Sequence, residues 1–336
     1  MHSPLLHIED LHIHFPAEGG PSRPVQGLDL QIEPAETVCL VGESGCGKTL
    51  SALSVLGLLP CPPGYIPQGR VLLQGRDVLR MSPQQLRELR GDRVGMVFQD
   101  PLTSLNPVFS IGQQLEEAFS AHNRMQAQEL RQACIQALHK VGIQDPEARL
   151  HNYPHQLSGG QRQRVLIAMA MACAPDLLIA DEPTTALDVT VQAQILSLLR
   201  SLTRQQDQSV LYITHDLGVV RSVADRVYIM YAGLIVEQGP SRSIFQDPRH
   251  PYTQGLLTSM PGFDKKGQEL YTIPGTVPDP GHRPSGCPFH PRCFAARPWC
   301  SRQLPSLQRC GSEHLVRCPV LNQAPPAATL APGAIA

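Results

Sequence analysis

The chain has 336 residues, with 28 Lys and Arg against 29 Asp and Glu and a formal net charge of -1. This length allows one large domain and a smaller appended region, and the balanced charge provides neither a nucleic-acid footprint nor a polybasic membrane anchor. The N-terminus lacks a secretory signal pattern, and the most apolar run, VLIAMAMACA, is shorter than the roughly 20 residues of a membrane helix. The sequence therefore predicts a cytosolic chain without a membrane span and without a nucleic-acid partner.

The first 60 residues predict short strands followed by a helix. Strand patterns occur in LLHIEDLHIHF and in LDLQIEPAETVCLV, and the turn-rich segment AEGGPSRP separates them. The second of these runs into a glycine-rich loop. After this loop, TLSALSVLGLL has helical spacing, and we expect the helix to end at Pro60.

The middle of the chain alternates between helix and strand patterns. A helical insert is predicted at about 100–165, because its apolar residues recur every three to four positions. Beyond it come a helix in QRQRVLIAMAMACA, a buried strand in LLIADE, a helix in VTVQAQILSLLRSLTRQQ and a strand in SVLYITH. This alternation predicts a parallel sheet in an α/β fold.

The composition changes near residue 240. Sixteen of the 32 prolines lie at or beyond Pro240, where helix and strand patterns become rare. We predict a main domain at 1–240, a connector at 241–269 and a cysteine-rich region at 270–322. The Pro- and Ala-rich stretch 323–336 is expected to be disordered.

The segment GESGCGKT follows a strand, precedes a helix and matches the phosphate-loop pattern G-x-x-x-x-G-K-[ST]. Its backbone amides and the positive end of the next helix can bind phosphate oxygens. We expect Lys48 to reach the β and γ phosphates of a nucleotide and Thr49 to hold Mg²⁺. The nucleotide-binding residues of this loop are Gly42, Glu43, Ser44, Gly45, Cys46, Gly47, Lys48 and Thr49.

Two acidic residues follow the apolar strand LLIA. Asp181 comes at the carboxyl end of this strand, the edge at which α/β sheets bind ligands, and it fits Mg²⁺ coordination through water. Glu182 is the candidate general base for the attacking water, a role typically worth about 10² to 10⁴ in rate.

The segment LSGGQ precedes the helix in QRQRVLIAMAMACA and places a hydroxyl and bare amides at the helix N-terminus, which is a second possible anion site. One triphosphate does not need two such sites from one chain. We therefore expect the second site to serve the nucleotide of a partner; its residues are Ser158, Gly159, Gly160 and Gln161.

The order GESGCGKT, FQDP, LSGGQ, LLIADE, LD and ITHD resembles the ATP-binding subunits of ABC transporters over residues 5–240. The resemblance implies an α/β fold: a P-loop NTPase, ABC-type nucleotide-binding domain with a helical subdomain, followed here by a small irregular cysteine-rich region. It also implies that two subunits enclose two ATP molecules, with each phosphate loop facing the LSGGQ of the other subunit.

The same resemblance assigns roles to single residues. Gln99 would touch Mg²⁺ and relay the nucleotide state to membrane subunits, Asp188 would cross the dimer interface and His215 would sense the γ phosphate. Phe15 would stack on adenine, with a core or turn role as the alternative. One departure is Thr185, which precedes Ala186 where many members have Ser.

Cys46 has two possible roles. A thiol near a helix N-terminus can have a lowered pKa and a raised reactivity. In that case alkylation would inhibit turnover and ATP would protect. The alternative is that Cys46 is a spacer in the loop.

Five of the ten cysteines fall between Cys287 and Cys318. Zinc is not suggested by the spacing, because tight C-x₂-C pairs are absent, and a cytosolic location argues against stable disulfides. Four thiolates could hold a 4Fe-4S cluster, and unliganded buried thiols or a zinc ion remain the alternatives.

The segments RHPYTQGLL, IPGTVPDP and GCPFHPRCFAARPWC resemble the dipeptide and oligopeptide importer branch of the same family. That branch has seventeen residues between its third and fourth ligands. The resemblance therefore implies a 4Fe-4S cluster on Cys287, Cys293, Cys300 and Cys318, with Cys310 as the spare thiol.

The expected function is ATP hydrolysis that powers the import of dipeptides or oligopeptides, with ATP, Mg²⁺ and the cluster as cofactors. The implied partners are a homologous, non-identical ATPase subunit, two membrane permeases and, indirectly, an external peptide-binding protein. The subunit would be peripheral on the cytoplasmic face of the inner membrane. Alternatives are import of nickel or glutathione, or a DNA-repair ATPase of the same family, although the long heptad arms of the latter are absent.

Overall fold

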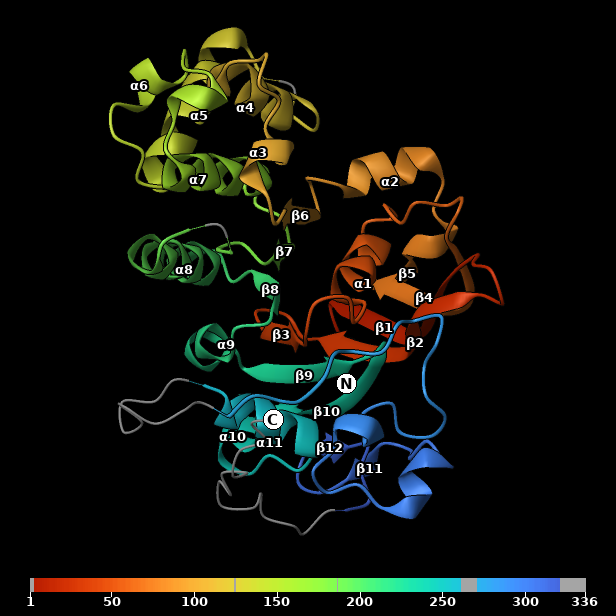
Figure 1. Ribbon diagram of the computed structural model, residues 1–336. Coiled ribbons are helices and arrows are strands. Elements are labelled where there is room, and N and C mark those ends of the chain that lie inside the picture. The colour runs from red at the N-terminus through yellow and green to blue at the C-terminus, as the bar shows by residue number, and fades with distance from the viewer. Residues whose placement is uncertain (1–2, 124, 186, 261–270, 321–336) are drawn as a thin grey trace.

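The computed structural model describes residues 3–123, 125–185, 187–260 and 271–320. Its centre is an 8-stranded sheet with the order β11-β12-β10-β9-β3-β8-β7-β6 (Figure 1). These strands are β3 (Thr37–Val41), β6 (Val94–Val97), β7 (Leu177–Asp181), β8 (Ser209–Thr214), β9 (Arg226–Tyr231), β10 (Leu234–Pro240), β11 (Gln308–Arg309) and β12 (Leu315–Val316).

The strands from β9 to β6 in this order are parallel, as the alternation of strands and helices predicted. The rest of the sheet was not predicted, because β10 turns back antiparallel on β9 and β12 adds to β10. Through β12 the cysteine-rich region joins the main sheet (Figure 1).

A second, 4-stranded sheet has the order β2-β1-β4-β5 and is antiparallel throughout. It consists of β1 (Leu6–Phe15), β2 (Ser22–Ile32), β4 (Tyr65–Leu73) and β5 (Arg76–Asp77). The expected strand LDLQIEPAETVCLV is in fact two strands, β2 and β3. The chain turns between them at Ala35, which has a φ of 59°.

Helix α1 (Lys48–Val55) follows the phosphate loop and ends earlier than the expected stop at Pro60. The reason is Gly57, whose left-handed φ of 59° lets the amide of Leu58 bond the carbonyl of Leu53. A glycine in this conformation ends a helix and satisfies its last carbonyls. The short helices η1 (Val78–Arg80) and α2 (Pro83–Leu89) come before β6.

Between β6 and β7 the chain forms a helical lobe, at the top of Figure 1. It contains α3 (Pro101–Ser104), α4 (Ile111–Ser120), α5 (Ala127–Lys140), α6 (Pro146–Arg149), η2 (Pro154–Gln156) and α7 (Gly159–Ala170). After β7 come α8 (Val189–Gln205) and α9 (Leu217–Val223), and after β10 come α10 (Ser241–Gln246), α11 (Pro251–Thr258), η4 (His290–Arg292) and η5 (Pro298–Ser301).

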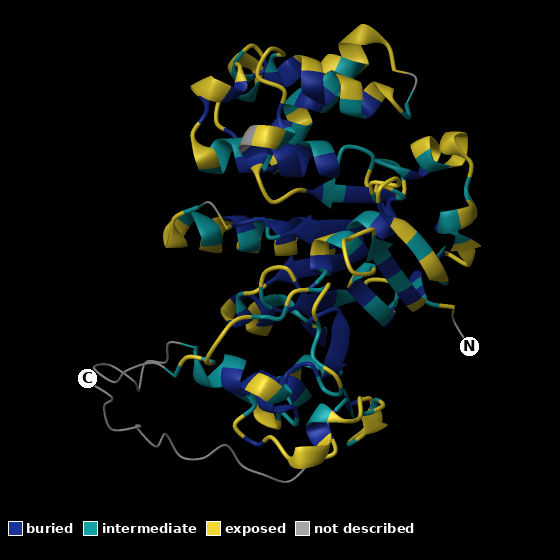
Figure 2. Ribbon diagram, turned by 45° about the vertical axis from the view of Figure 1, so that its right-hand side comes forward, coloured by how far each residue is buried: buried dark blue, intermediate teal, exposed yellow. Residues whose placement is uncertain are grey.

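The central strands separate two buried layers (Figure 2). In β3, Val38 and Leu40 pack with the antiparallel sheet and α1, whereas Cys39 and Val41 pack with the helices on the other side. This alternation follows from the two-residue period of a strand. The position of the phosphate loop is therefore fixed by a strand that is buried on both faces.

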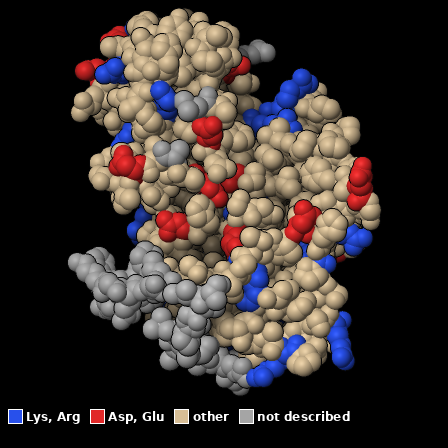
Figure 3. All heavy atoms as spheres, in the orientation of Figure 1, with Lys and Arg blue, Asp and Glu red and all other residues tan. Residues whose placement is uncertain are grey.

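Along the described ranges, no helix combines the length and the apolar character that a membrane span requires. On the face in Figure 3, basic side chains lie in small groups among neutral and acidic ones. The expected disordered tail at 323–336 lies outside the described residues.

Candidate functional site

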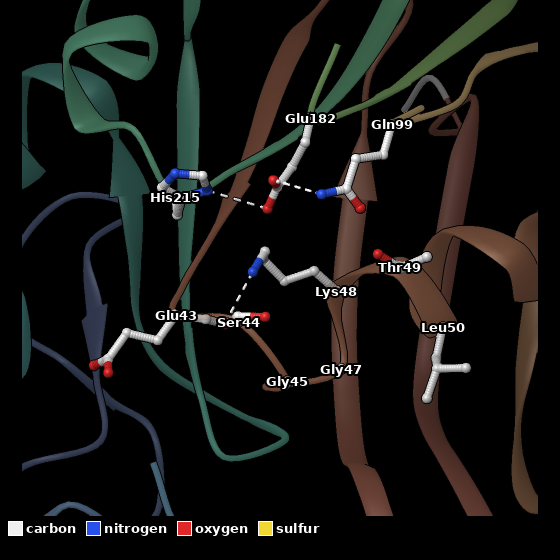
Figure 4. A pocket seen from close by; sticks show the side chains of 10 residues that line it. All are labelled: Glu43, Ser44, Gly45, Gly47, Lys48, Thr49, Leu50, Gln99, Glu182 and His215. Atoms are coloured by element: carbon white, nitrogen blue, oxygen red, sulfur yellow. Dashed lines mark hydrogen bonds and ion pairs between the residues drawn. The ribbon is translucent and has the colours of Figure 1, made fainter. Parts of the chain in front are cut away.

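Four parallel strands bring the predicted nucleotide residues together. The phosphate loop follows β3, Gln99 lies just beyond β6, Glu182 follows β7 and His215 follows β8. Because these strands are parallel neighbours, their carboxyl ends meet at one edge of the sheet, where α/β proteins bind ligands. Figure 4 shows the side chains of Gln99, Glu182 and His215 gathered above Lys48.

The phosphate loop needs its glycines for conformation and for space. Gly45 and Gly47 have left-handed φ values of 79° and 105°, and a Cβ at Gly47 would lie 2.4 Å from the carbonyl oxygen of Pro24. Only glycine fits this position without strain. The loop thus passes directly from Gly47 into α1, whose N-terminus faces the site.

The site is a cavity of about 510 Å³, within the range of small-molecule sites. Lys48 is buried, and its ammonium group donates hydrogen bonds to the carbonyls of Gly42 (2.8 Å) and Glu43 (3.0 Å). The cavity lining is formed by Glu43, Ser44, Gly45, Gly47, Lys48, Thr49, Leu50, Gln99, Glu182 and His215.

Glu182 is held by three neighbours. Its carboxylate accepts hydrogen bonds from Gln99 Nε2 (3.1 Å) and Thr185 Oγ1 (2.9 Å), and it lies 3.1 Å from His215 Nδ1 (Figure 4). Burial alone would raise the pKa of Glu182, but the hydrogen bonds from His215 and Thr185 outweigh it, so the pKa is lowered. The carboxylate is therefore ionised and oriented at neutral pH. Thr185 retains the hydroxyl of the expected Ser, which explains why this departure does not disturb the site.

Thr49 and Asp181 are the oxygen donors expected to hold Mg²⁺. Burial raises the pKa of Asp181, and a hydrogen bond with Thr49 partly opposes this shift. Asp181 Oδ1 is buried and has no hydrogen-bond partner among the described residues. Because an unpaired buried carboxylate oxygen is costly, and hydroxyl and carboxylate oxygens suit Mg²⁺, these residues fit a Mg²⁺ ion bound together with a nucleotide.

Ser158, Gly159, Gly160 and Gln161 are absent from the lining of the described cavity. They begin α7 in the helical lobe, where Ser158 and Gln161 form a capping box: Ser158 Oγ accepts from the Gln161 amide at 3.3 Å, and Gln161 Oε1 accepts from the Ser158 amide at 3.0 Å. The chain thus carries a second helix N-terminus that its own phosphate loop does not use.

Five other predicted residues also lie outside the cavity lining: Phe15, Gly42, Cys46, Asp181 and Asp188. Asp188 is exposed and caps α8 by accepting from the amides of Thr190 and Val191. Phe15 is partly buried at the end of β1, and its ring would contact a Cβ placed at Gly64.

Cys46 is 1% exposed, and burial raises the pKa of its thiol although Lys48 opposes the shift. The lowered pKa suggested by the helix N-terminus is therefore wrong. Desolvation of the thiolate raises the pKa more than the charge of Lys48 and the backbone amides lower it. The structure therefore fits the spacer role.

Sequence reasoning missed two contacts to the phosphate loop from the C-terminal part of the chain. Arg292 forms an ion pair with the carboxylate of Glu43, and the Tyr252 hydroxyl accepts a hydrogen bond from the Glu43 amide. The only sequence signal was the position of both residues in segments typical of the importer branch, RHPYTQGLL and GCPFHPRCFAARPWC.

The four predicted cluster ligands line one small apolar cavity of about 20 Å³, together with His250 and Phe289. Burial raises the pKa of three of these thiols, to about 12 for Cys293 and about 11 for Cys318, and upward for Cys287. The cavity has room for about one water molecule. In the described part of the chain, no three His, Cys, Asp or Glu side chains are close enough together to hold a metal ion.

Two family models match the chain. The model of the ABC transporter family matches residues 25–185, and the model described as "Oligopeptide/dipeptide transporter, C-terminal region" matches residues 236–300. The second match includes three of the four predicted cluster ligands.

Curated relatives match almost the whole chain. The dipeptide transport ATP-binding protein DppD of Bacillus subtilis is 47% identical, over 95% of both chains. The oligopeptide transport ATP-binding protein OppD of the same organism is 46% identical, over 95% of this chain and 89% of its own length.

Among solved structures, the ATP-binding cassette MJ0796, a dimer in a post-hydrolysis state bound to ADP and phosphate, matches with a TM-score of 0.62 and 26% identity. The match covers 70% of this chain and 99% of that one. The protein cbiO1 from Clostridium perfringens, part of an ABC transporter complex, has the same TM-score and identity and covers 73% of this chain and 91% of its own.

Proposed function

This chain belongs to the ABC transporter family and is an ATPase subunit, and we propose that it powers the import of dipeptides or oligopeptides through a membrane transporter. One observation carries the proposal. The phosphate loop, Gln99, Glu182 and His215 line one cavity, in a chain that matches a dipeptide transport ATP-binding protein over 95% of its length. ATP and Mg²⁺ are the expected ligands of this cavity.

In this proposal Lys48 binds the β and γ phosphates. Its ammonium group donates hydrogen bonds to two loop carbonyls, and the residue lines the cavity while being only 5% exposed. Thr49, Asp181 and Gln99 would hold Mg²⁺, which would supply positive charge against the phosphates. The unpaired Asp181 Oδ1 supports this assignment.

Glu182 acts as the general base. Its lowered pKa keeps the carboxylate ready to accept a proton, and the hydrogen bonds from Gln99 and Thr185 fix its direction. His215, on the other side of Glu182, is placed to contact the γ phosphate. A positioned base of this kind typically contributes about 10² to 10⁴ in rate.

The second helix N-terminus supports a two-subunit site. We propose that Ser158, Gly159, Gly160 and Gln161 contact the ATP of a homologous ATPase subunit, and that the exposed Asp188 lies at that interface. The dimeric form of MJ0796 shows that a cassette with this fold can pair. We expect a heterodimer, with closure of the pair required for hydrolysis.

Three exposed apolar side chains lie close to Gln99 in the sequence. Phe98, Val108 and Phe109 follow β6 and are 39%, 71% and 45% exposed. Exposed apolar side chains are candidates for a protein contact. We propose that the transporter contains two permeases and that this segment contacts one of them. We also propose that the subunit is peripheral on the cytoplasmic face of the inner membrane, and that an external peptide-binding protein delivers the solute.

We further propose that Cys287, Cys293, Cys300 and Cys318 hold a 4Fe-4S cluster. Their convergence on one cavity and the all-thiol donor set support this proposal. The cavity is too small for a cluster as it stands, so the ligand-bearing loops would have to move apart on loading. Metal sites of this kind commonly form only when the metal binds.

The proposal is tested with the Glu182→Gln variant in the importer complex, purified with its permeases. We expect ATP to bind, ATP hydrolysis to fall by at least about a hundredfold, and peptide uptake into proteoliposomes to stop. The matched control is Glu88→Gln, an exposed change in α2. Normal turnover of the Glu182 variant would exclude this residue as the base, and uptake of nickel or glutathione without peptide uptake would overturn the substrate assignment.

A further inference from the structure

Glu43 places a carboxylate in the phosphate loop, which in the proposed function binds the anionic triphosphate. The Glu43 side chain points away from Lys48 and toward the C-terminal part of the chain (Figure 4). Its direction is set by Arg292, whose Nη1 lies 3.1 Å from both carboxylate oxygens and whose Nη2 lies 3.2 Å from one of them. Such forked contacts are the strongest geometry for an arginine and a carboxylate.

Arg292 is itself fixed in place. Its side chain is 7% exposed, its Nε donates to the carbonyl of Pro274 at 2.7 Å, and its Nη1 donates to the Tyr231 hydroxyl at 3.2 Å. Its guanidinium carbon also lies 5.7 Å from the centre of the Tyr231 ring. The residue therefore has one conformation available and presents it to Glu43.

A second contact holds the backbone of the same residue. The Tyr252 hydroxyl accepts a hydrogen bond from the Glu43 amide at 3.1 Å. Tyr252 is fully buried in α11 and packs with Tyr231 and Phe289, at ring distances of 4.7 Å and 5.3 Å. Glu43 is thus held at its amide and at its carboxylate by residues beyond position 250.

Arg292 also belongs to the cysteine-rich region. It ends η4, which lies between Cys287 and Cys293, and Cys293 is its neighbour in the chain. The pairing of Arg292 with Glu43 therefore joins two sites that are about 250 residues apart in sequence, the thiol cavity and the phosphate loop.

We propose that Arg292 is a positioning residue of the nucleotide site, which holds the Glu43 carboxylate out of the phosphate cavity and so makes ATP affinity depend on the cysteine-rich region. This inference rests on the proposed function. The physical reason is charge. Without Arg292, a free carboxylate would lie beside the triphosphate in a partly buried site, where like charges repel more strongly than in water. Arg292 removes that repulsion by pairing with Glu43.

The experiment measures binding of N-methylanthraniloyl-ATP to the full-length chain by fluorescence titration. For Arg292→Ala we expect binding about tenfold weaker, equivalent to about 1.4 kcal/mol. Arg292→Lys keeps the charge without the forked contact, so its loss should be smaller. The double variant Glu43→Gln/Arg292→Ala should bind more tightly than Arg292→Ala, because the repelling charge is gone.

The matched control is Arg317→Ala. Arg317 is a partly buried arginine of the cysteine-rich region, which donates to the carbonyls of Ile235 and Pro305 rather than to the loop. The Arg317→Ala variant should unfold at a lower temperature than the wild type. Its nucleotide affinity should stay within about twofold of the wild type, because Arg317 makes no contact with Glu43.

Two results would overturn the inference. The first is that Arg317→Ala weakens nucleotide binding as much as Arg292→Ala does, which would indicate a general loss of structure in the cysteine-rich region. The second is that the double variant binds nucleotide no more tightly than Arg292→Ala, which would exclude charge repulsion. A wild-type chain that fails to bind the analogue would instead contradict the proposed function, so the two failures are distinguishable.

Discussion

Cys310 and Cys318 flank the same short strand β12, yet their surroundings differ. Cys318 is buried and lines the thiol cavity with Cys287, Cys293 and Cys300. The Cys310 thiol instead donates to the carbonyl of His314 at 3.4 Å and does not line that cavity. This difference agrees with the assignment of Cys318 as a ligand and Cys310 as the spare thiol.

The cluster proposal predicts different outcomes for these two residues. Chain purified without oxygen should be brown, with about four iron and four sulfide per chain. The Cys318→Ser variant should lose most of its iron and sulfide because the substitution removes a ligand, whereas Cys310→Ser should retain both. Assays of iron and acid-labile sulfide measure this difference. Colourless wild-type protein that carries zinc, or equal loss in both variants, would rule the cluster out.

At the residue scale, the sequence predicted residues that the structure brings to one cavity. Lys48, Gln99, Glu182 and His215 line one cavity, because each motif encodes a residue type at the end of a strand. The Arg292 to Glu43 contact could not be predicted in this way. It depends on how a proline-rich region of little regular structure packs against the sheet. The hydrophobic pattern of the local sequence carries no information about that packing.

At the element scale, the antiparallel sheet depends on a close approach between β1 and β4. Asp10 in β1 has a left-handed φ of 42°, and the pairing with β4 shifts register between Glu9 and His12. Gly69 in β4 passes this bulge with a φ of 110°, and a Cβ there would lie 2.5 Å from Leu11 Cα. The bulge therefore requires glycine at position 69.

Gly69→Ala should destabilise the protein strongly, because the clash is with backbone atoms that cannot move independently. We expect about 2–5 kcal/mol from overpacking and left-handed strain together, measured by urea unfolding. Gly75→Ala is the matched control, since Gly75 also has a left-handed φ of 78° but open space around it, and it should cost only about 1–2 kcal/mol. Equal costs for both variants would show that the close approach is unimportant.

Helices and strands with a clear hydrophobic periodicity were predicted at the right positions in the chain, whereas their ends were predicted less accurately. The buried strand at Leu177–Asp181 and the helix at Val189–Gln205 lie where the patterns placed them. The end of α1 at Val55 was missed because a left-handed glycine outweighs continuing apolar spacing. Local backbone conformation, which the apolar pattern does not encode, decided that boundary.

At the scale of the whole molecule, the cysteine-rich region is joined to the main sheet. Glu237 of β10 pairs with Val316 of β12, and the buried Glu237 carboxylate lies 2.8 Å from His314 Nε2 and accepts from the His250 amide at 2.9 Å. The sequence indicated a separate region from its prolines and cysteines. It could not indicate this attachment, because strands of two residues carry no readable pattern.

Within the described ranges, the strands of this chain assemble the cavity at the phosphate loop, and the N-terminus of α7 lies outside it. The central claim follows from this arrangement: the chain supplies half of each of two ATP sites, and the other halves come from a homologous subunit. Binding and hydrolysis should then depend on different residues. Residues of this chain alone, the phosphate loop together with Arg292, should suffice for binding, and Ser158 should be needed only for hydrolysis at the paired site.

The most direct test is Ser158→Arg, assayed for nucleotide binding in the full-length chain and for ATP hydrolysis in the purified importer complex. Binding should stay within about twofold of the wild type, while hydrolysis should fall about a hundredfold, the usual effect of losing a preorganised donor. The account would be contradicted by a chain that stays monomeric throughout turnover and, with Ser158→Arg in place, still hydrolyses ATP at the wild-type rate.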